Sequence, residues 1–197
     1  MSSVHAVAVI PARYDSQRFP GKVLADVAGR PLIQWVYGRT AQASRIDAAY
    51  VATDSPKVRD ACLAFTPNVH LSRRAHPSGT DRVAELAGDI PADLFVNVQT
   101  DEPMMEPALV DALVDLMDDT EVDFASAVGP IRDMRDFLDP NVVKVVCDGG
   151  GNALYFSRAP IPWPREVDLE PAAPWPDGFV AWKHIGIYAY RREALLE

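Results

Sequence analysis

The sequence is poor in cysteine and has no long apolar run. Its two cysteines, Cys62 and Cys147, form no metal-binding or redox spacing, and a chain of 197 residues can bury a core without disulfides. No apolar run approaches the roughly 20 residues that a membrane helix needs. The N-terminus also lacks the basic start and the cleavage site of a secretory signal. These absences exclude a disulfide scaffold and a membrane span, and they predict a location in the reducing cytoplasm.

Positive charge is scarce as well. Nineteen Lys and Arg stand against 28 Asp and Glu, which gives a net charge of -9 and a pI near 4.9. A protein that binds the phosphate backbone of nucleic acid normally presents a net basic face. The composition therefore argues against nucleic acid as a partner.

Short apolar runs alternate with amphipathic segments over the first two thirds of the chain. The pattern predicts strands at 4–10, 48–52, 69–71 and 94–98, with helices at 31–43, from 56, at 80–87 and at 107–117. Such alternation is typical of parallel βαβ units. Later strands, predicted at 124–128, 142–146, 153–156 and 180–190, follow without long helices and indicate antiparallel additions. We therefore expect one domain over 1–197, with a three-layer α/β/α fold and a mixed sheet.

The segment of about 157–180 is rich in proline and tryptophan. Six of the 17 prolines and two of the four tryptophans, Trp163 and Trp175, lie between Ser157 and Gly178. Proline at this density is incompatible with a helix or a central strand. Two interpretations stay open: a surface loop, or an arm that buries its aromatic side chains against a second subunit.

The stretch VIPARYDSQRFPGK joins the first predicted strand to a basic loop. Arg13, Arg18 and Lys22 have few acids nearby in sequence and would repel one another unless an anion or solvent intervened. Ligands of open α/β sheets bind beyond the carboxyl ends of the strands, where this loop begins. A polyphosphate would satisfy these cations, and the alternative is a solvated loop whose cations pair with acids elsewhere. The stretch contains neither a Walker motif nor a dinucleotide fingerprint.

Asp101 follows the predicted strand 94–98 almost directly. A carboxylate at this point projects toward the crevice of the basic loop, where it is suited to a divalent ion that bridges phosphate oxygens. The alternative is that Asp101 caps the turn before the next helix. Phosphate-binding cations together with one metal-binding acid predict a nucleotidyl-transfer site.

Three further features each have an ordinary alternative. The stretch HPSGT at 76–80 offers backbone amides and hydroxyl groups to a base, ribose or phosphate, but it is equally a normal helix cap. His184 lies in an apolar strand and by default is a core histidine. Arg158 follows a strand predicted to be buried, where an arginine needs a carboxylate or phosphate partner.

Six stretches in this order resemble the motifs of the 3-deoxy-manno-octulosonate cytidylyltransferase family, also called CMP-Kdo synthetases. They are VIPARYDSQRFPGK, SRRAHPSGTDR, VNVQTDEPM, NVVKVVCD, ALYFSRAPIPW and KHIGIYAYR, and the resemblance runs from about residue 6 to residue 192. It implies a nucleotide-diphospho-sugar-transferase-like (Rossmann-like) fold and a homodimer. It also implies Mg2+-dependent transfer of CMP from CTP to an acidic sugar, most directly 3-deoxy-manno-octulosonate (Kdo).

The resemblance assigns roles residue by residue. Catalysis falls to Arg13, Lys22 and Asp101, and Asp101 also binds Mg2+. CTP binding is implied for Ala12, Arg13, Arg18, Lys22, Arg73, Ser78, Gly79 and Asp101. The acceptor pocket is implied for Gln99, Arg158, His184 and Tyr188, with Arg158 facing the acceptor carboxylate.

The sequence departs from the family in two places. Thr100 stands where the family usually has glycine, and its branched side chain fills space close to the acceptor. Family members also continue beyond the position of Glu197 with a second magnesium-binding aspartate in a G-V-D-T-P-like motif, which this sequence does not contain. The chain is thus a piece of a longer one or a short relative, whose acceptor could be a sialic-acid-like sugar or a small phosphonate. The alternative to an enzyme is a non-catalytic paralogue that binds CTP.

Overall fold

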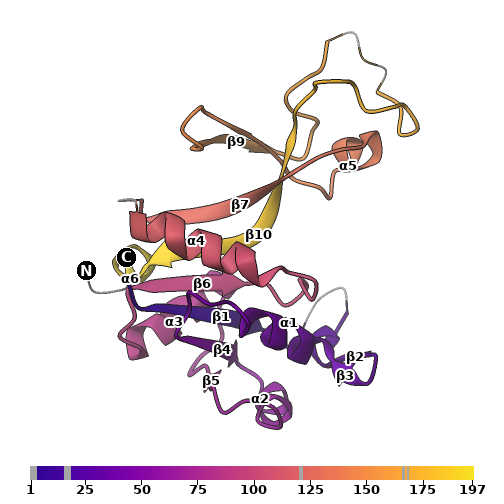
Figure 1. Ribbon diagram of the computed structural model, residues 1–197. Coiled ribbons are helices and arrows are strands. Elements are labelled where there is room, and N and C mark those ends of the chain that lie inside the picture. The colour runs from indigo at the N-terminus through magenta and orange to yellow at the C-terminus, as the bar shows by residue number, and fades with distance from the viewer. Residues whose placement is uncertain (1–3, 16–18, 120–121, 166, 168) are drawn as a thin grey trace. The chain divides into compact units, whose positions relative to one another are not determined.

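The computed structural model describes the chain except for residues 1–3, 16–18, 120–121, 166 and 168 (Figure 1). The chain divides into two compact units. Unit 1 comprises Met1–Ala125 and Ile187–Glu197, and unit 2 comprises Ser126–Gly186. The segment of 157–180, predicted as an arm, lies within unit 2.

Unit 1 is built on a largely parallel sheet with the strand order β5-β4-β1-β6-β10. Its strands are β1 (Ala6–Ala12), β4 (Ala48–Thr53), β5 (Val69–Leu71), β6 (Leu94–Val98) and the last residues of β10 (Trp182–Arg191). β4 and β6 each pair in parallel with β1, and β10 pairs antiparallel with β6. All seven residues of β1 are buried, as expected of a central strand that is covered on both faces.

Helices flank this sheet on both faces, which confirms the predicted α/β class. They are α1 (Leu32–Thr40), α2 (Pro56–Cys62), α3 (Gly79–Asp89), α4 (Pro107–Asp119) and α6 (Arg192–Leu196). Val7 and Val9 of β1 pack in one cluster with Val83 and Leu86 of α3, and the alternate residues of β1 are buried on the opposite face. α1 and α4 contact each other, and they lie side by side in front of the sheet in Figure 1.

Side-chain caps explain where two helices of unit 1 begin, α2 and α3. The side chain of Ser55 accepts a hydrogen bond from the Val58 amide and precedes Pro56 at the first helical position of α2. α3 begins with a capping box formed by Ser78 and Asp81. The sequence did not predict α6, the 3-10 turn η1 (Lys22–Leu24) or the hairpin of β2 (Asp26–Val27) and β3 (Arg30–Pro31). These elements are too short to leave a periodic pattern.

Unit 2 contains most of β7 (Phe124–Pro130), α5 (Met134–Leu138), β8 (Lys144–Cys147), β9 (Ala153–Ser157) and the first residues of β10. β8 pairs antiparallel with both β10 and β9, as the sequence predicted for the later strands. The small core of unit 2 is aromatic: Phe137 packs edge-to-face on Trp175 and Phe179 at centroid distances of 5.7 and 5.6 Å. The proline-rich segment after β9 has neither helix nor strand among its described residues.

The two tryptophans of that segment have different surroundings. Trp175 packs in the aromatic core, and its Nε1 donates a hydrogen bond to the Phe179 carbonyl at 3.1 Å. Trp163 is exposed in the single chain, as are Leu154, Tyr155 and Phe156 of β9. Within the ranges that the structure describes, no helix has both the length and the apolar content to cross a membrane.

Candidate active site

The carboxyl ends of β1 and β6 bring a basic loop and an acidic loop together. β1 has β4 on one side and β6 on the other, so the order of the parallel strands reverses between β1 and β6, where open α/β sheets bind ligands. The loop after β1 carries Lys22, and the turn after β6 carries Asp101. Lys22 Nζ lies 3.3 Å from Asp101 Oδ2, with the two side chains 39% and 54% exposed. Both groups can therefore reach a ligand at this edge.

Glycine and tyrosine give the basic loop its turn. Gly21 has a φ of 74°, its amide donates to the Tyr14 carbonyl at 2.7 Å, and a Cβ at this position would meet the Tyr14 ring at 3.3 Å. From α2, Lys57 Nζ donates to the Tyr14 hydroxyl at 2.8 Å and lies over its ring. The turn places Lys22 directly after Gly21. Arg18, a predicted triphosphate ligand, lies outside the described residues.

Arg13 lines a cavity of about 370 Å³ at the end of β1. Its Nη2 donates to the His76 carbonyl at 2.9 Å, so the cation is held by a backbone oxygen and its charge is not neutralised by that contact. The cavity is lined by Arg13, Tyr14, Asp15, Asp54, Ser55, Pro56 and His76. Lys22 and Asp101 are not among these lining residues. The site thus consists of a cavity beside Arg13 and an ion pair at the neighbouring strand end.

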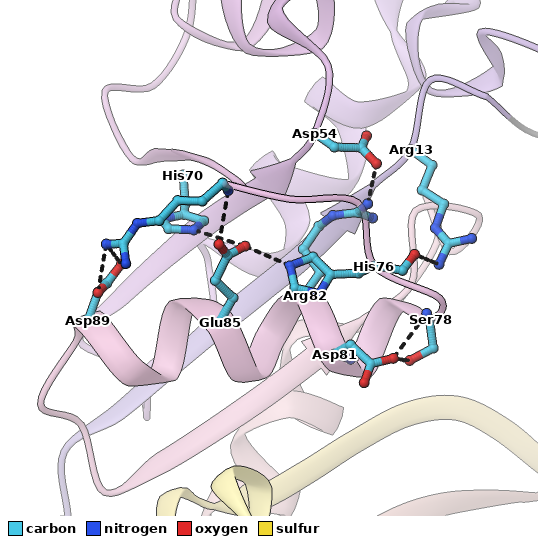
Figure 2. A network of polar contacts seen from close by, with 10 residues as sticks. Arg13, Asp54, His70, His76, Ser78, Asp81, Arg82, Glu85 and Asp89 are labelled. Carbon is cyan, nitrogen blue, oxygen red and sulfur yellow. Dashed lines mark hydrogen bonds and ion pairs between the residues drawn. The ribbon is translucent and has the colours of Figure 1, made fainter.

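A polar network lies behind this cavity (Figure 2). Arg82 of α3 is fully buried, and its Nη2 donates to Asp54 Oδ2 at 2.6 Å. Burial lowers the pKa of Arg82, the nearby charge of Arg13 lowers it further, and Asp54 and Glu85 act in the opposite direction. Glu85 in turn contacts the ring of His76 at 2.7 Å. The sequence reasoning missed this network, because the partners of Arg82 and Glu85 come from separate loops.

Ser78 and Gly79 bring the start of α3 close to β1. The Ser78 hydroxyl accepts a hydrogen bond from the Asp81 amide at 3.1 Å, which is the helix-cap alternative that the sequence left open. A Cβ on Gly79 would lie 3.2 Å from Pro11 Cγ, so any other residue here would require Pro11 to shift. Contact of Ser78 and Gly79 with cytidine stays a prediction.

Two residues predicted to bind CTP lie apart from the cavity of Arg13. Arg73 Nη2 donates to both carboxylate oxygens of Asp89 at 3.0 and 2.8 Å, and Arg73 lines a different cavity with Leu195. Ala12 is fully buried in β1, opposite Thr53. Its methyl group therefore has no access to a ligand in this state. The CTP contacts of both residues stay predictions.

The acidic turn suits a divalent ion that also binds phosphate. Among the described residues, no group of three or more His, Cys, Asp or Glu could hold a metal by itself. Mg2+ is usually bound by one or two carboxylates together with substrate phosphates and water, and the exposed Asp101 carboxylate fits that pattern. Burial and the neighbouring charge of Asp101 raise the pKa of Glu102, with Lys22 opposing them. Asp101 is the member of this acidic pair whose carboxylate contacts Lys22.

The residues predicted for the acceptor pocket divide between the two units. In unit 1, Gln99 Nε2 donates to Asn97 Oδ1 at 3.3 Å, and Asn97 lies opposite Tyr188 in the pairing of β6 with β10. Asn97 is buried, and burial raises the pKa of the half-buried Tyr188. Thr100 follows Gln99 directly. The turn after β6 thus carries a predicted acceptor ligand beside the predicted metal ligand.

In unit 2, one premise of the sequence analysis is wrong. β9 is exposed, so Arg158 does not follow a buried strand and needs no anionic partner in this chain; its Nη1 donates to the Pro140 carbonyl at 2.7 Å. His184 is half-buried, its Nε2 lies 2.8 Å from Ser126 Oγ, and burial lowers its pKa. The acceptor roles of Arg158 and His184 stay predictions.

Known proteins resemble this chain over nearly its whole length. Residues 7–197 match the family model described as Cytidylyltransferase. A 3-deoxy-manno-octulosonate cytidylyltransferase of Pelobacter propionicus is 47% identical over 197 residues, which cover 98% of this chain and 77% of that protein. The enzyme of the same name from Geobacter sulfurreducens is 46% identical, over 98% of this chain and 79% of its own length.

Solved structures agree with the sequence relatives. A CMP:2-keto-3-deoxy-manno-octonic acid synthetase complexed with CTP superposes with a TM-score of 0.87 and 43% identity, over 97% of this chain and 76% of that one. A 4-diphosphocytidyl-2C-methyl-D-erythritol synthase from Anaerococcus prevotii shares the fold alone, at a TM-score of 0.59 and 12% identity. The chain therefore belongs to the cytidylyltransferase family, among the 3-deoxy-manno-octulosonate cytidylyltransferases.

Proposed function

We propose that this protein transfers CMP from CTP to the sugar acid Kdo and releases pyrophosphate. The contact between Lys22 and Asp101 is the observation that carries the proposal, because it puts a phosphate-binding cation and a metal-binding acid at one strand edge. The similarity to enzymes named for Kdo, and to a synthetase solved with CTP, supports both substrates.

The chemistry is an in-line displacement at the α-phosphorus of CTP. A hydroxyl oxygen of the acceptor forms a bond to this phosphorus, and the bond to the bridging oxygen of the β-phosphate breaks, so that pyrophosphate leaves with the bond electrons and the hydroxyl proton passes to solvent. Negative charge grows on the phosphate oxygens during the transfer. We propose that Arg13 and Lys22 stabilise that charge, an effect commonly worth several kcal/mol in a site that excludes water.

We further propose that Asp101 holds Mg2+ when CTP is bound. The metal would neutralise charge on the phosphate oxygens and make pyrophosphate a better leaving group. Lys22 Nζ donates a hydrogen bond to Asp101 Oδ2. We propose that Lys22 turns from Asp101 toward a phosphate oxygen when the metal–nucleotide complex binds. An exchange of this kind would keep the charges of both side chains balanced before and after binding.

We also propose that the chain forms a homodimer through unit 2, in the cytoplasm. Leu154, Tyr155 and Phe156 are consecutive exposed apolar residues of β9, and exposed apolar side chains that gather on a surface often mark an interface. Both cysteines are free thiols, which suits a reducing compartment.

Pyrophosphate release tests the function directly. The purified chain, CTP and Mg2+ are incubated with Kdo, a sialic acid or a small phosphonate, and the nucleotide products are identified by mass. We expect pyrophosphate and CMP-Kdo with Kdo. If only another acid gives a product, that acid replaces Kdo as the proposed acceptor. If the chain binds CTP but releases no pyrophosphate with any of the acids, the non-catalytic alternative is favoured.

A further inference from the structure

Glu85 anchors the segment that follows β5 to helix α3 (Figure 2). Its Oε1 accepts a hydrogen bond from the backbone amide of Arg73 at 2.9 Å, and its Oε2 lies 2.7 Å from His76 Nε2. His70 Nε2 is 3.7 Å from the same oxygen, which is too long for a hydrogen bond. One carboxylate therefore fixes both ends of the short stretch from Arg73 to His76.

The contact with Glu85 determines how His76 is held. An ionised carboxylate only accepts hydrogen bonds, so the proton of the contact lies on His76 Nε2. The His76 side chain is 2% exposed and that of Glu85 is 10% exposed, so water cannot readily replace either partner. The backbone carbonyl of this same histidine accepts the hydrogen bond from Arg13 Nη2 at 2.9 Å. Contacts thus run without a break from Glu85 through His76 to the Arg13 guanidinium.

The charge on Glu85 matters to the same group of residues. Burial opposes that charge, but hydrogen bonds from His76 and from the Arg73 amide outweigh it and lower the pKa of Glu85 to about 2. The carboxylate is therefore ionised at neutral pH. Together with Asp54 it offsets the buried cation Arg82, which is close enough to Arg13 for the two positive charges to repel. Without Glu85, Arg13 would lose both its anchored carbonyl and part of this compensation.

We propose that Glu85 is a positioning residue that sets the Arg13 guanidinium for the triphosphate of CTP, acting through His76. The inference rests on the proposed function, because the position of Arg13 has a consequence only for a polyphosphate ligand. Glu85 does not line the cavity of Arg13 and belongs to the wall of another one. Glu85 therefore acts on CTP indirectly, through the residues that it holds.

A double-mutant cycle on CTP binding tests this dependence. The dissociation constant of CTP with Mg2+ is measured by calorimetry for the unaltered chain, Glu85→Ala, Arg13→Ala and the double variant. We expect Glu85→Ala to weaken CTP binding about tenfold when Arg13 is present and less than about twofold when it is absent. An equal loss in both backgrounds would overturn the proposal.

Two further variants separate positioning from general stability. Glu85→Gln keeps the shape of the side chain and one acceptor oxygen, so it should fold and weaken CTP binding only about threefold. Asp111→Ala is the matched control, because Asp111 anchors another loop of unit 1 by accepting from the Arg45 amide at 2.8 Å and from the Ser44 hydroxyl at 3.0 Å. It should lower the melting temperature and leave CTP affinity unchanged. An equal loss of affinity in Asp111→Ala would reduce Glu85 to a residue that only supports the fold.

The guanidinium of Arg13 gives a measurement that needs no ligand. In the unaltered chain we expect the hydrogen bond to His76 to slow its rotation and to give separate Nη signals in NMR spectra, identified by their loss in Arg13→Ala. These signals should merge in Glu85→Ala. If the Arg13 signals merge in Glu85→Ala but the unaltered chain binds no CTP, the proposed function is refuted and the coupling of Glu85 to Arg13 stands. Unchanged signals would refute the coupling itself.

Discussion

Units 1 and 2 bury their apolar residues in different ways. The central strands of unit 1 are buried between helices along their whole length, as in β1, which carries small aliphatic side chains, and in β6. Unit 2 has a small aromatic core around Phe137 and leaves Leu154, Tyr155 and Phe156 of β9 exposed. A sheet that is covered on both faces completes its own core, whereas unit 2 leaves these apolar side chains exposed in the single chain. The difference supports two proposals, that unit 1 binds the nucleotide and that unit 2 forms the dimer contact.

Two cations of unit 2 are held by backbone carbonyls, whereas Lys22 of unit 1 contacts a carboxylate. In unit 2, the buried Lys144 donates to the Asp139 and Val142 carbonyls at 2.9 and 2.6 Å, and Arg158 donates to the Pro140 carbonyl. Burial lowers the pKa of Lys144. These contacts hold the loop between α5 and β8. In unit 1, Lys22 faces an exposed carboxylate at the strand edge, so its charge is available to a ligand.

Of the variants that test this comparison of the two units, we expect Lys22→Ala to have the largest effect. Loss of the cation at the strand edge should lower turnover about a hundredfold, because charge that grows on the phosphate oxygens would lose a preorganised partner. Lys183→Ala is the matched control: Lys183 in unit 2 also pairs with an aspartate, Asp136, at 2.6 Å, and has the same exposure as Lys22. Its turnover should stay within about twofold of the unaltered chain.

Steady-state pyrophosphate release at saturating CTP and Kdo measures both lysine variants. A near-normal rate in Lys22→Ala would remove the central assignment of the site. Equal losses of turnover in the two variants would show that the effect is not specific to Lys22. The functional difference between the two units would then be contradicted.

The sequence was sufficient for the strands of unit 1 and for the position of its basic loop. Runs such as AVAVIPA and LFVNV are mostly apolar because both faces of these strands are covered. Their composition is therefore enough to predict that they are buried. The helix predicted from residue 56 likewise begins at Pro56. The burial of β9 was predicted wrongly, because the run ALYFS reads as buried although its side chains are exposed in the single chain.

The network behind the cavity could not be predicted in the same way. Arg82 and Glu85 are three residues apart on α3 and therefore lie on the same side of the helix. Their partners Asp54 and His76 come from separate loops. Only the packing of α3 on the ends of β1 and β4 brings these four residues together. Spacing along a sequence predicts which side of a helix a charge occupies and does not predict the loop that meets it.

A smaller effect is expected from Leu154→Asp, which tests the apolar surface of unit 2. A charge within a dimer interface should raise the dimer dissociation constant at least about tenfold, measured by sedimentation over a range of concentrations. Leu63→Asp places the same charge on unit 1, where Leu63 is 53% exposed compared with 66% for Leu154, and should leave association unchanged. A chain that is monomeric before any substitution would contradict the proposed dimer.

The smallest effect separates the two interpretations of Ser78. Ser78→Ala removes the cap of α3 and should lower the free energy of unfolding by about 1 kcal/mol. Asp133→Ala removes the corresponding cap of α5 in unit 2, where Asp133 accepts from the Asp136 amide at 2.8 Å. If Ser78 also contacts the cytidine, only Ser78→Ala will raise the KM for CTP, by a few-fold, because a lost hydrogen bond to a bound ligand costs about 0.5–1.5 kcal/mol. Unchanged KM values in both variants, with similar losses in urea denaturation, would make Ser78 a helix cap and remove it from the predicted CTP contacts.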